Sequence, residues 1–187
     1  MRFNDHSKLA GSHAFLSPSN YHWVNDDEEK MDARIATYYA ARRGSELHDL
    51  AQQMIRLKVN LPDTGQTLNS YVNDCIGFRM TPEQTLFYTK NCYGQADAIG
   101  FNKKNQLRIF DLKTGVTPAK MTQLYVYAAL FCLEYNFKPI EIDMEFRIYQ
   151  NDDTTIEQGD PLVVTQIMSQ IVFYDQRIDQ LRMEAYG

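Results

Sequence analysis

The sequence predicts an α/β or α+β fold in which a mixed sheet is flanked by helices. Three observations support this: helical periodicity dominates residues 17–78, three short β-prone runs follow between 83 and 114, and a helix, a strand and a long helix complete the chain. The chain has 187 residues, of which 44% are hydrophobic and 23% charged, as in ordinary globular proteins. This length predicts one domain over residues 1–187 with a substantial core, preceded by a flexible arm over residues 1–15.

Start signals mark the N-terminal helices. Ser17 and Pro18 suit the cap and first position of a helix, and the acidic run 26–29 suits the start of a second one. Apolar residues recur at helical spacing over 31–39 and, after Gly44, over 47–55. Residues 60–65 indicate a break, and 68–78 predict a further helix.

Short β-type runs cover residues 83–89, 94–101 and 107–114, with a hairpin turn at 102–105. The strongly apolar segment 121–135 predicts a helix packed on the sheet. Residues 141–149 alternate apolar and charged side chains, which indicates a half-buried strand, and 161–186 predict a long C-terminal helix.

The net charge of −5 argues against a protein that coats nucleic acid through a uniformly basic surface. It allows an enzyme with an acidic metal site and local basic residues. Such local charges are Arg42, Arg43, Lys103, Lys104 and Lys120, and the alternative for each is a solvated surface residue.

The three cysteines, Cys75, Cys92 and Cys132, have no metal-ligand spacing. Their odd number, without an apolar leader segment, predicts a reduced protein of the cytoplasm. No run approaches the ~18 uninterrupted apolar residues of a membrane span, so we expect no membrane association.

Asp97, Asp111 and Lys113 stand where buried strands normally carry apolar side chains. If 94–101 and 107–114 pair as a hairpin, the two aspartates lie near each other, and Asp111 shares a strand face with Lys113. Burying two carboxylates and an ammonium in a core without a functional role costs free energy. The same three groups suit the binding of Mg²⁺ or Mn²⁺, with the Lys113 ammonium placed at the reacting group. The Leu112 carbonyl is a further candidate ligand, and a structural ion pair at the sheet edge is the alternative.

Four motifs occur along the chain in this order: Gly44-x-x-x-His48, Gly94-x-x-Asp97, Asp111-x-Lys113 and Gln123-x-x-x-Tyr127. The series resembles that of the PD-(D/E)XK nuclease superfamily, specifically its RecB-like branch, which includes many phage exonucleases. The stretch 13–23 resembles the start of phage and prophage members. The resemblance covers most of residues 13–150 and implies a restriction-endonuclease-like αβββαβ core, with extra N-terminal helices and a long C-terminal helix in this chain.

The resemblance also implies catalytic roles. Asp97 and Asp111 would bind the metal, His48 would be a further ligand, and Lys113 would orient or help deprotonate the attacking water. Glu83 is a candidate accessory ligand. The alternatives are an ordinary helix histidine for His48 and an exposed strand-edge residue for Glu83.

Gln123 and Tyr127 lie one helical turn apart, so both can face the site and hold DNA or Lys113. The alternative for both is ordinary helix packing. Members of this branch that carry an iron–sulfur cluster need four suitably placed cysteines, so we expect no cluster here.

The expected function is that of a metal-dependent deoxyribonuclease, foremost a phage-type exonuclease in recombination or repair. Alternatives are a structure-selective or non-specific endonuclease and a catalytically idle DNA-binding or inhibitory module. The implied partners are linear duplex DNA or its ends and a phage single-strand annealing protein, in the cytoplasm of a phage-infected or prophage-bearing bacterium. The sequence leaves the oligomeric state open.

Overall fold

The computed structural model describes residues 4–9 and 11–186, the last of these by its backbone. The chain divides into two compact units, residues 1–43 and 44–187. The division falls inside helix α1 (Glu28–Leu57).

The first unit contains two short 3₁₀ helices, η1 (Ser7–Leu9) and η2 (Pro18–Asn25), and the beginning of α1. Pro18 is the first residue of η2, as expected, but this helix is a 3₁₀ helix. The Ser17 hydroxyl does not cap the helix, and it lies 2.8 Å from the Ser19 hydroxyl. The Asp27 carboxylate accepts a hydrogen bond from the Lys30 amide at 2.9 Å, so the acidic run does start α1. Of the predicted arm over residues 1–15, residues 1–3 and 10 lie outside the described part of the chain.

Helix α1 continues through Gly44, where the sequence indicated two separate helices. A glycine inside a helix costs about 1 kcal/mol relative to alanine. Here a Cβ at Gly44 would lie 2.8 Å from the Thr114 hydroxyl oxygen. The glycine therefore lets the segment after the third strand approach α1, and it does not end the helix.

The second unit is built on a five-stranded mixed sheet with the order β1-β2-β3-β4-β5. Its strands are β1 (Thr81–Thr89), β2 (Cys92–Phe101), β3 (Gln106–Leu112), β4 (Asp143–Gln150) and β5 (Asp153–Gln158). Only β3 and β4 are parallel, because helix α3 (Thr122–Tyr135) connects them, and the other neighbours are antiparallel. The predicted mixed sheet flanked by helices is confirmed.

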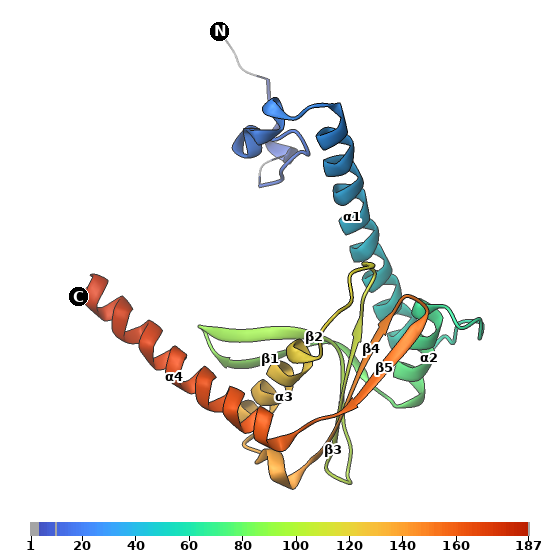
Figure 1. The fold of residues 1–187 in the computed structure, drawn as a ribbon, viewed down its shortest axis with the longest axis vertical. Coiled ribbons are helices and arrows are strands. Elements are labelled where there is room, and N and C mark those ends of the chain that lie inside the picture. The colour runs from blue at the N-terminus through green and yellow to red at the C-terminus, as the bar shows by residue number, and fades with distance from the viewer. Residues whose placement is uncertain (1–3, 10, 187) are drawn as a thin grey trace. The chain divides into compact units, whose positions relative to one another are not determined.

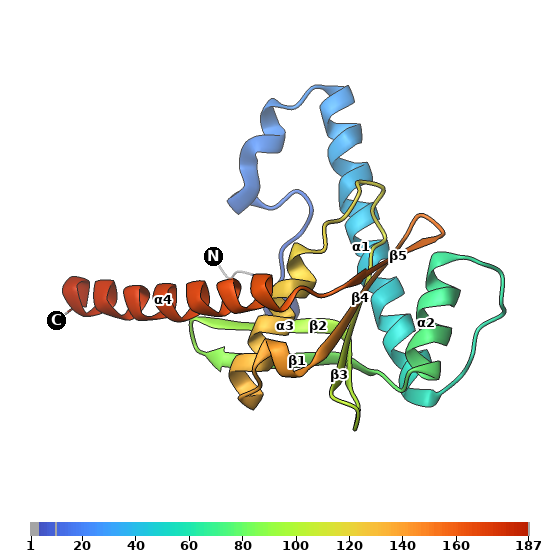
Figure 2. The same ribbon diagram turned by 60° about the horizontal axis from the view of Figure 1, so that its bottom comes forward.

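Helices lie on both faces of this sheet (Figure 1), and a hydrophobic cluster fills the space beneath them on each face. On one face, α3 and α4 (Pro161–Tyr186) pack on Leu107, Ile109 and Phe146. Helix α2 (Thr67–Gly77) and the end of α1 lie on the other face (Figure 2). There they pack on Phe110 and Tyr149. The predicted helices over 68–78, 121–135 and 161–186 are thus confirmed within a residue or so at their ends.

The hairpin turn between β2 and β3 also forms as expected. The Asn102 side-chain oxygen accepts hydrogen bonds from the amides of Lys104 and Gln106, and Asn105 takes the left-handed conformation with φ of 57°. None of the helices in the described residues is long and apolar enough to cross a membrane.

Candidate metal and catalytic centre

The candidate site lies where β2 and β3 separate. The two strands pair over Ala98–Phe101 and Leu107–Phe110, so Asp97 and Asp111 are the first residues beyond the paired stretch. The backbone amide of Leu112 donates a hydrogen bond to Asp97 Oδ2 at 2.9 Å. Burial, and then the nearby Asp111 carboxylate, raise the pKa of Asp97. The structure therefore brings the two predicted aspartates together.

Lys113 is held against Asp111. Its Nζ lies 3.0 Å from Asp111 Oδ1 and 2.9 Å from Oδ2, and the hydrogen bond is made to Oδ1. Asp111 is 2% exposed, and its Oδ2 accepts no hydrogen bond. The Lys113 ammonium, 2.9 Å from Oδ2, offsets the charge of this oxygen in the metal-free protein, and a carboxylate oxygen with one such contact still has a lone pair for a metal cation.

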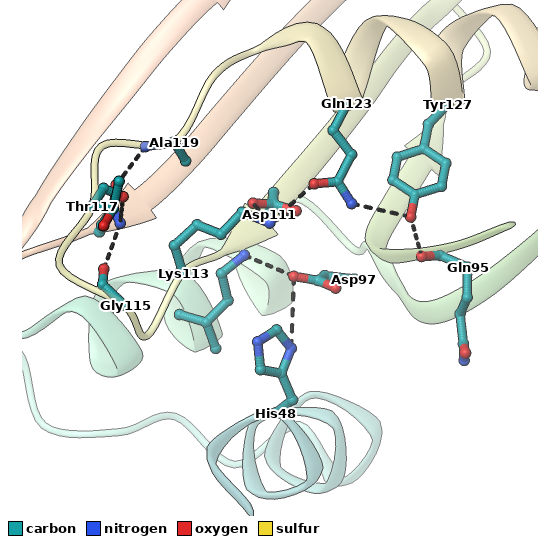
Figure 3. Close-up of polar contacts among 12 residues, drawn as sticks. His48, Gln95, Asp97, Asp111, Lys113, Gly115, Thr117, Ala119, Gln123 and Tyr127 are labelled. Carbon is teal, nitrogen blue, oxygen red and sulfur yellow. Dashed lines mark hydrogen bonds and ion pairs between the residues drawn. The ribbon is translucent and has the colours of Figure 1, made fainter. Parts of the chain in front are cut away.

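A second group of ligands converges beside this pair. His48 on α1, Glu83 on β1 and Asp97 on β2 each offer one atom within 4.8 Å of the others. His48 Nδ1 lies 3.6 Å from Asp97 Oδ2 (Figure 3). Burial, and then the charge of Asp97, raise the pKa of Glu83. An imidazole with two carboxylates is a donor set that suits Mn²⁺ better than Mg²⁺.

Glu83 reaches this cluster through an unusual backbone. Its φ is +52° within β1, a left-handed conformation that is rare for glutamate and costs of order 1–3 kcal/mol. Its neighbours Pro82 and Gln84 pair with Ala98 and Ala96, which puts Glu83 level with Asp97. Such strain is concentrated at functional sites in proteins. Of the two sequence interpretations of Glu83, the geometry favours the accessory ligand.

Gln123 and Tyr127, both on α3, connect Lys113 to strand β2 through a chain of hydrogen bonds. Gln123 Oε1 accepts a hydrogen bond from Lys113 Nζ at 3.0 Å, and Gln123 Nε2 donates to the Tyr127 hydroxyl at 3.3 Å. The Tyr127 hydroxyl in turn donates to the carbonyl of Gln95 on β2 (Figure 3). A Cβ at Gly94 would lie 3.2 Å from the Tyr127 ring, so the glycine of this motif admits the tyrosine.

Sequence reasoning missed Gln150, which holds the segment between β3 and α3. Its Nε2 donates to the carbonyls of Gly115 and Thr117, and its Oε1 accepts from the Ala119 amide at 3.0 Å (Figure 3). One amide side chain thus fixes three backbone groups of the loop that joins Lys113 to Gln123. A glutamine at the end of a strand gives no sequence signal for this role.

The remaining predicted residues are not gathered at the cluster. Lys103 and Lys104 lie in the β2–β3 turn, beyond Phe101, which is four residues or about 13 Å along β2 from Asp97. Lys120 lies in the loop before α3.

Arg42 and Arg43 lie on α1 in the first unit. At the cluster, the backbone amide of Leu112 donates a hydrogen bond to Asp97. A metal-ligand role for the Leu112 carbonyl stays a prediction. The DNA-binding roles of the five basic residues stay predictions as well.

Comparison with protein families, curated proteins and solved structures finds no match to this chain.

Proposed function

We propose that the protein is a metal-dependent deoxyribonuclease. The observation that carries this proposal is the convergence of His48, Glu83 and Asp97 beside the buried Asp111–Lys113 pair, at the point where two strands separate. One imidazole and two carboxylates, with the Asp111 carboxylate beside them, are a donor set that suits Mn²⁺ or Mg²⁺, and an ammonium next to them suits a reaction that builds up negative charge.

His48, Glu83 and Asp97 would hold the cation, and Asp111, which lies beside this cluster and is ion-paired with Lys113, would be a further ligand. A bound divalent cation would supply Lewis-acid stabilisation of the phosphate oxygens. Asp111 and Gln123 aim the Lys113 ammonium, which can donate a hydrogen bond to the attacking water or to a phosphate oxygen. Tyr127 fixes the Gln123 amide, so the ammonium is positioned before substrate arrives.

The order of elements supports a restriction-endonuclease-like core as the finer assignment. Helices α1 and α2 precede a three-strand meander, and α3 then crosses to β4, which is parallel to β3. This is the αβββαβ order that the motif series implies. Within that framework, the biological role we propose is that of a phage-type exonuclease, active on DNA ends in a bacterial cytoplasm, with a single-strand annealing protein as its partner.

Incubation with end-labelled linear duplex and with covalently closed plasmid, in Mn²⁺ or Mg²⁺, tests the proposal. We expect the linear DNA to be degraded, the closed circles to persist, and EDTA to abolish the reaction. Cleavage of both substrates at equal rates would support an endonuclease. DNA binding without any cleavage in either metal would refute nuclease function and support an idle binding module.

A further inference from the structure

The outer part of the β1–β2 hairpin has one covered face and one open face. Leu86 and Ala96 are buried in the cluster formed with α3, and Gly94 contacts Tyr127 of the same helix. Side chains alternate along a strand, so the residues between these point to the opposite face. That face is exposed at Thr85 and Gln95.

Facing residues of β1 and β2 form successive rungs along the hairpin, outward from the metal site; the left-handed backbone at Glu83 interrupts the alternation of faces at the Glu83–Asp97 rung, and the open face begins at the next rung. Glu83 is level with Asp97, Thr85 pairs with Gln95, and Phe87 pairs with Tyr93; this last pair is called the aromatic rung. Rungs on one face are two residues apart, about 6.6 Å, so the aromatic rung lies about 13 Å from the Asp97 rung.

The aromatic rung is unusually exposed for two large rings. Phe87 is 51% exposed and Tyr93 is 64% exposed, and the rings stack with centroids 6.3 Å apart and planes inclined by 28°. The Thr85–Gln95 rung, which lies between the aromatic rung and the metal site, is polar. The two rings are therefore not an extension of the hydrophobic core. Flat aromatic surface isolated in this way suits a planar partner better than an aliphatic one.

The backbone beneath the rings is held from α3 and α4. The Phe87 amide donates to Glu134 Oε2 at 2.8 Å, and the Asn91 side chain donates to Asp175 Oδ1 at 2.9 Å. A partner that stacks on this hairpin therefore orders little of the protein, which favours binding.

We infer that Phe87 and Tyr93 form a stacking platform for unpaired bases, about 13 Å along the hairpin from Asp97. The inference rests on the proposed nuclease function and deepens it: the strand that enters the site is single-stranded at its end. The chain has a net charge of −5, so recognition through bases avoids dependence on a phosphate-binding surface. The position of the platform on the same hairpin as Glu83 and Asp97 favours nucleic acid as the occupant over a protein.

The platform is tested by binding alone, in EDTA, so that no cleavage is needed. Fluorescence anisotropy of a labelled oligothymidylate measures the affinity of the wild type and of Phe87→Ala, Tyr93→Ala and Tyr93→Phe. Stacking contributes roughly 1–3 kcal/mol per base, so each alanine variant should bind about 5- to 150-fold more weakly, while Tyr93→Phe stays within about twofold. The matched control is Tyr174→Ala, which removes an exposed tyrosine (59%) of α4 and should leave the affinity unchanged.

Unchanged affinity in both alanine variants would overturn the platform, whatever the cleavage assay shows. Loss of binding in these variants, together with a wild type that never cleaves DNA in Mn²⁺, would retain the platform and refute the nuclease. Circular dichroism checks that the variants fold. Wild-type protein crosslinked to an oligonucleotide carrying 4-thiothymidine gives a second readout: adducts should map to residues 87 or 93, and adducts confined to other segments would refute the inference.

Discussion

Replacing Lys113 by methionine removes the positive charge from a carboxylate that is almost fully buried. Asp111 is 2% exposed, and Lys113 is its ion-pair partner. Breaking a buried pair from one side typically costs 3–5 kcal/mol, because the remaining charge stays buried. The Lys113 side chain is 30% exposed, so solvent already screens part of this attraction. We therefore expect a loss of about 2–4 kcal/mol for Lys113→Met in the metal-free protein.

Urea unfolding followed by circular dichroism measures this loss. A matched control is Lys138→Met, which breaks an exposed pair with Glu141 and should cost about 0–1 kcal/mol. Changing Asp111→Asn in the Lys113→Met background removes the unpaired charge and should restore most of the stability.

Mn²⁺ distinguishes a metal ligand from a simple structural carboxylate. If Asp111 Oδ2 coordinates the cation, Mn²⁺ replaces the missing charge and should stabilise Lys113→Met by more than it stabilises the wild type. Equal stabilisation of the two proteins by Mn²⁺ would refute a ligand role for Asp111. A Lys113→Met variant as stable as Lys138→Met without metal would refute the buried ion pair itself.

Three further predictions concern the metal cluster and the loop that joins Lys113 to Gln123. His48→Ala should weaken Mn²⁺ binding more than Mg²⁺ binding in calorimetry, because imidazole is a poor ligand for Mg²⁺. An unchanged Mn²⁺ affinity would show that His48 is not a metal ligand. The raised pKa of Asp97 means that the folded, metal-free protein holds this proton to a higher pH than the unfolded chain does, so stability from the group is present at acidic pH and lost as the pH rises through the raised pKa. Asp97→Asn should therefore stabilise the metal-free protein at about pH 7.5 and much less at about pH 4, and an equal effect at both would contradict the cause given for the shift. Gln150→Ala should lower kcat/KM for DNA about tenfold while leaving Mn²⁺ affinity unchanged, because the amide holds the loop and not the cluster; reduced Mn²⁺ affinity would show that the loop shapes the metal site.

Much of this fold can be predicted from local sequence. Helix α4 and the β2–β3 turn carry strong periodicity or turn residues, so their positions agree with expectation. Strand β5 was missed because it is a short, mostly exposed edge strand of polar residues, introduced by a tight turn at Asn151 and Asp152. The reason for a glycine inside α1 is the close approach of Thr114, seventy positions later in the chain, and no local pattern shows this contact.

Some features of the candidate site can likewise be predicted from the sequence, and others cannot. The proximity of Asp97 and Asp111 follows from a hairpin and the two-residue period of a strand, both visible in the sequence. Sequence reasoning offers Glu83 as a candidate accessory ligand, but it does not show the left-handed backbone at this position, which glutamate seldom adopts. Gln150 acts through backbone groups of a distant loop, a contact that only the folded chain creates.

Single-turnover cleavage of 5′-labelled linear duplex, followed as a function of Mn²⁺ concentration for the wild type and Lys113→Met, tests the central claim most directly. The wild type should cleave with a rate that saturates in Mn²⁺. Lys113→Met should lose on the order of a hundredfold or more in the saturated rate, because a charge-stabilising donor is gone, and should need no more Mn²⁺ than the wild type to reach half of its own maximum. A wild type that leaves linear DNA intact at every Mn²⁺ concentration, or a Lys113→Met variant that cleaves at the wild-type rate, would contradict the account.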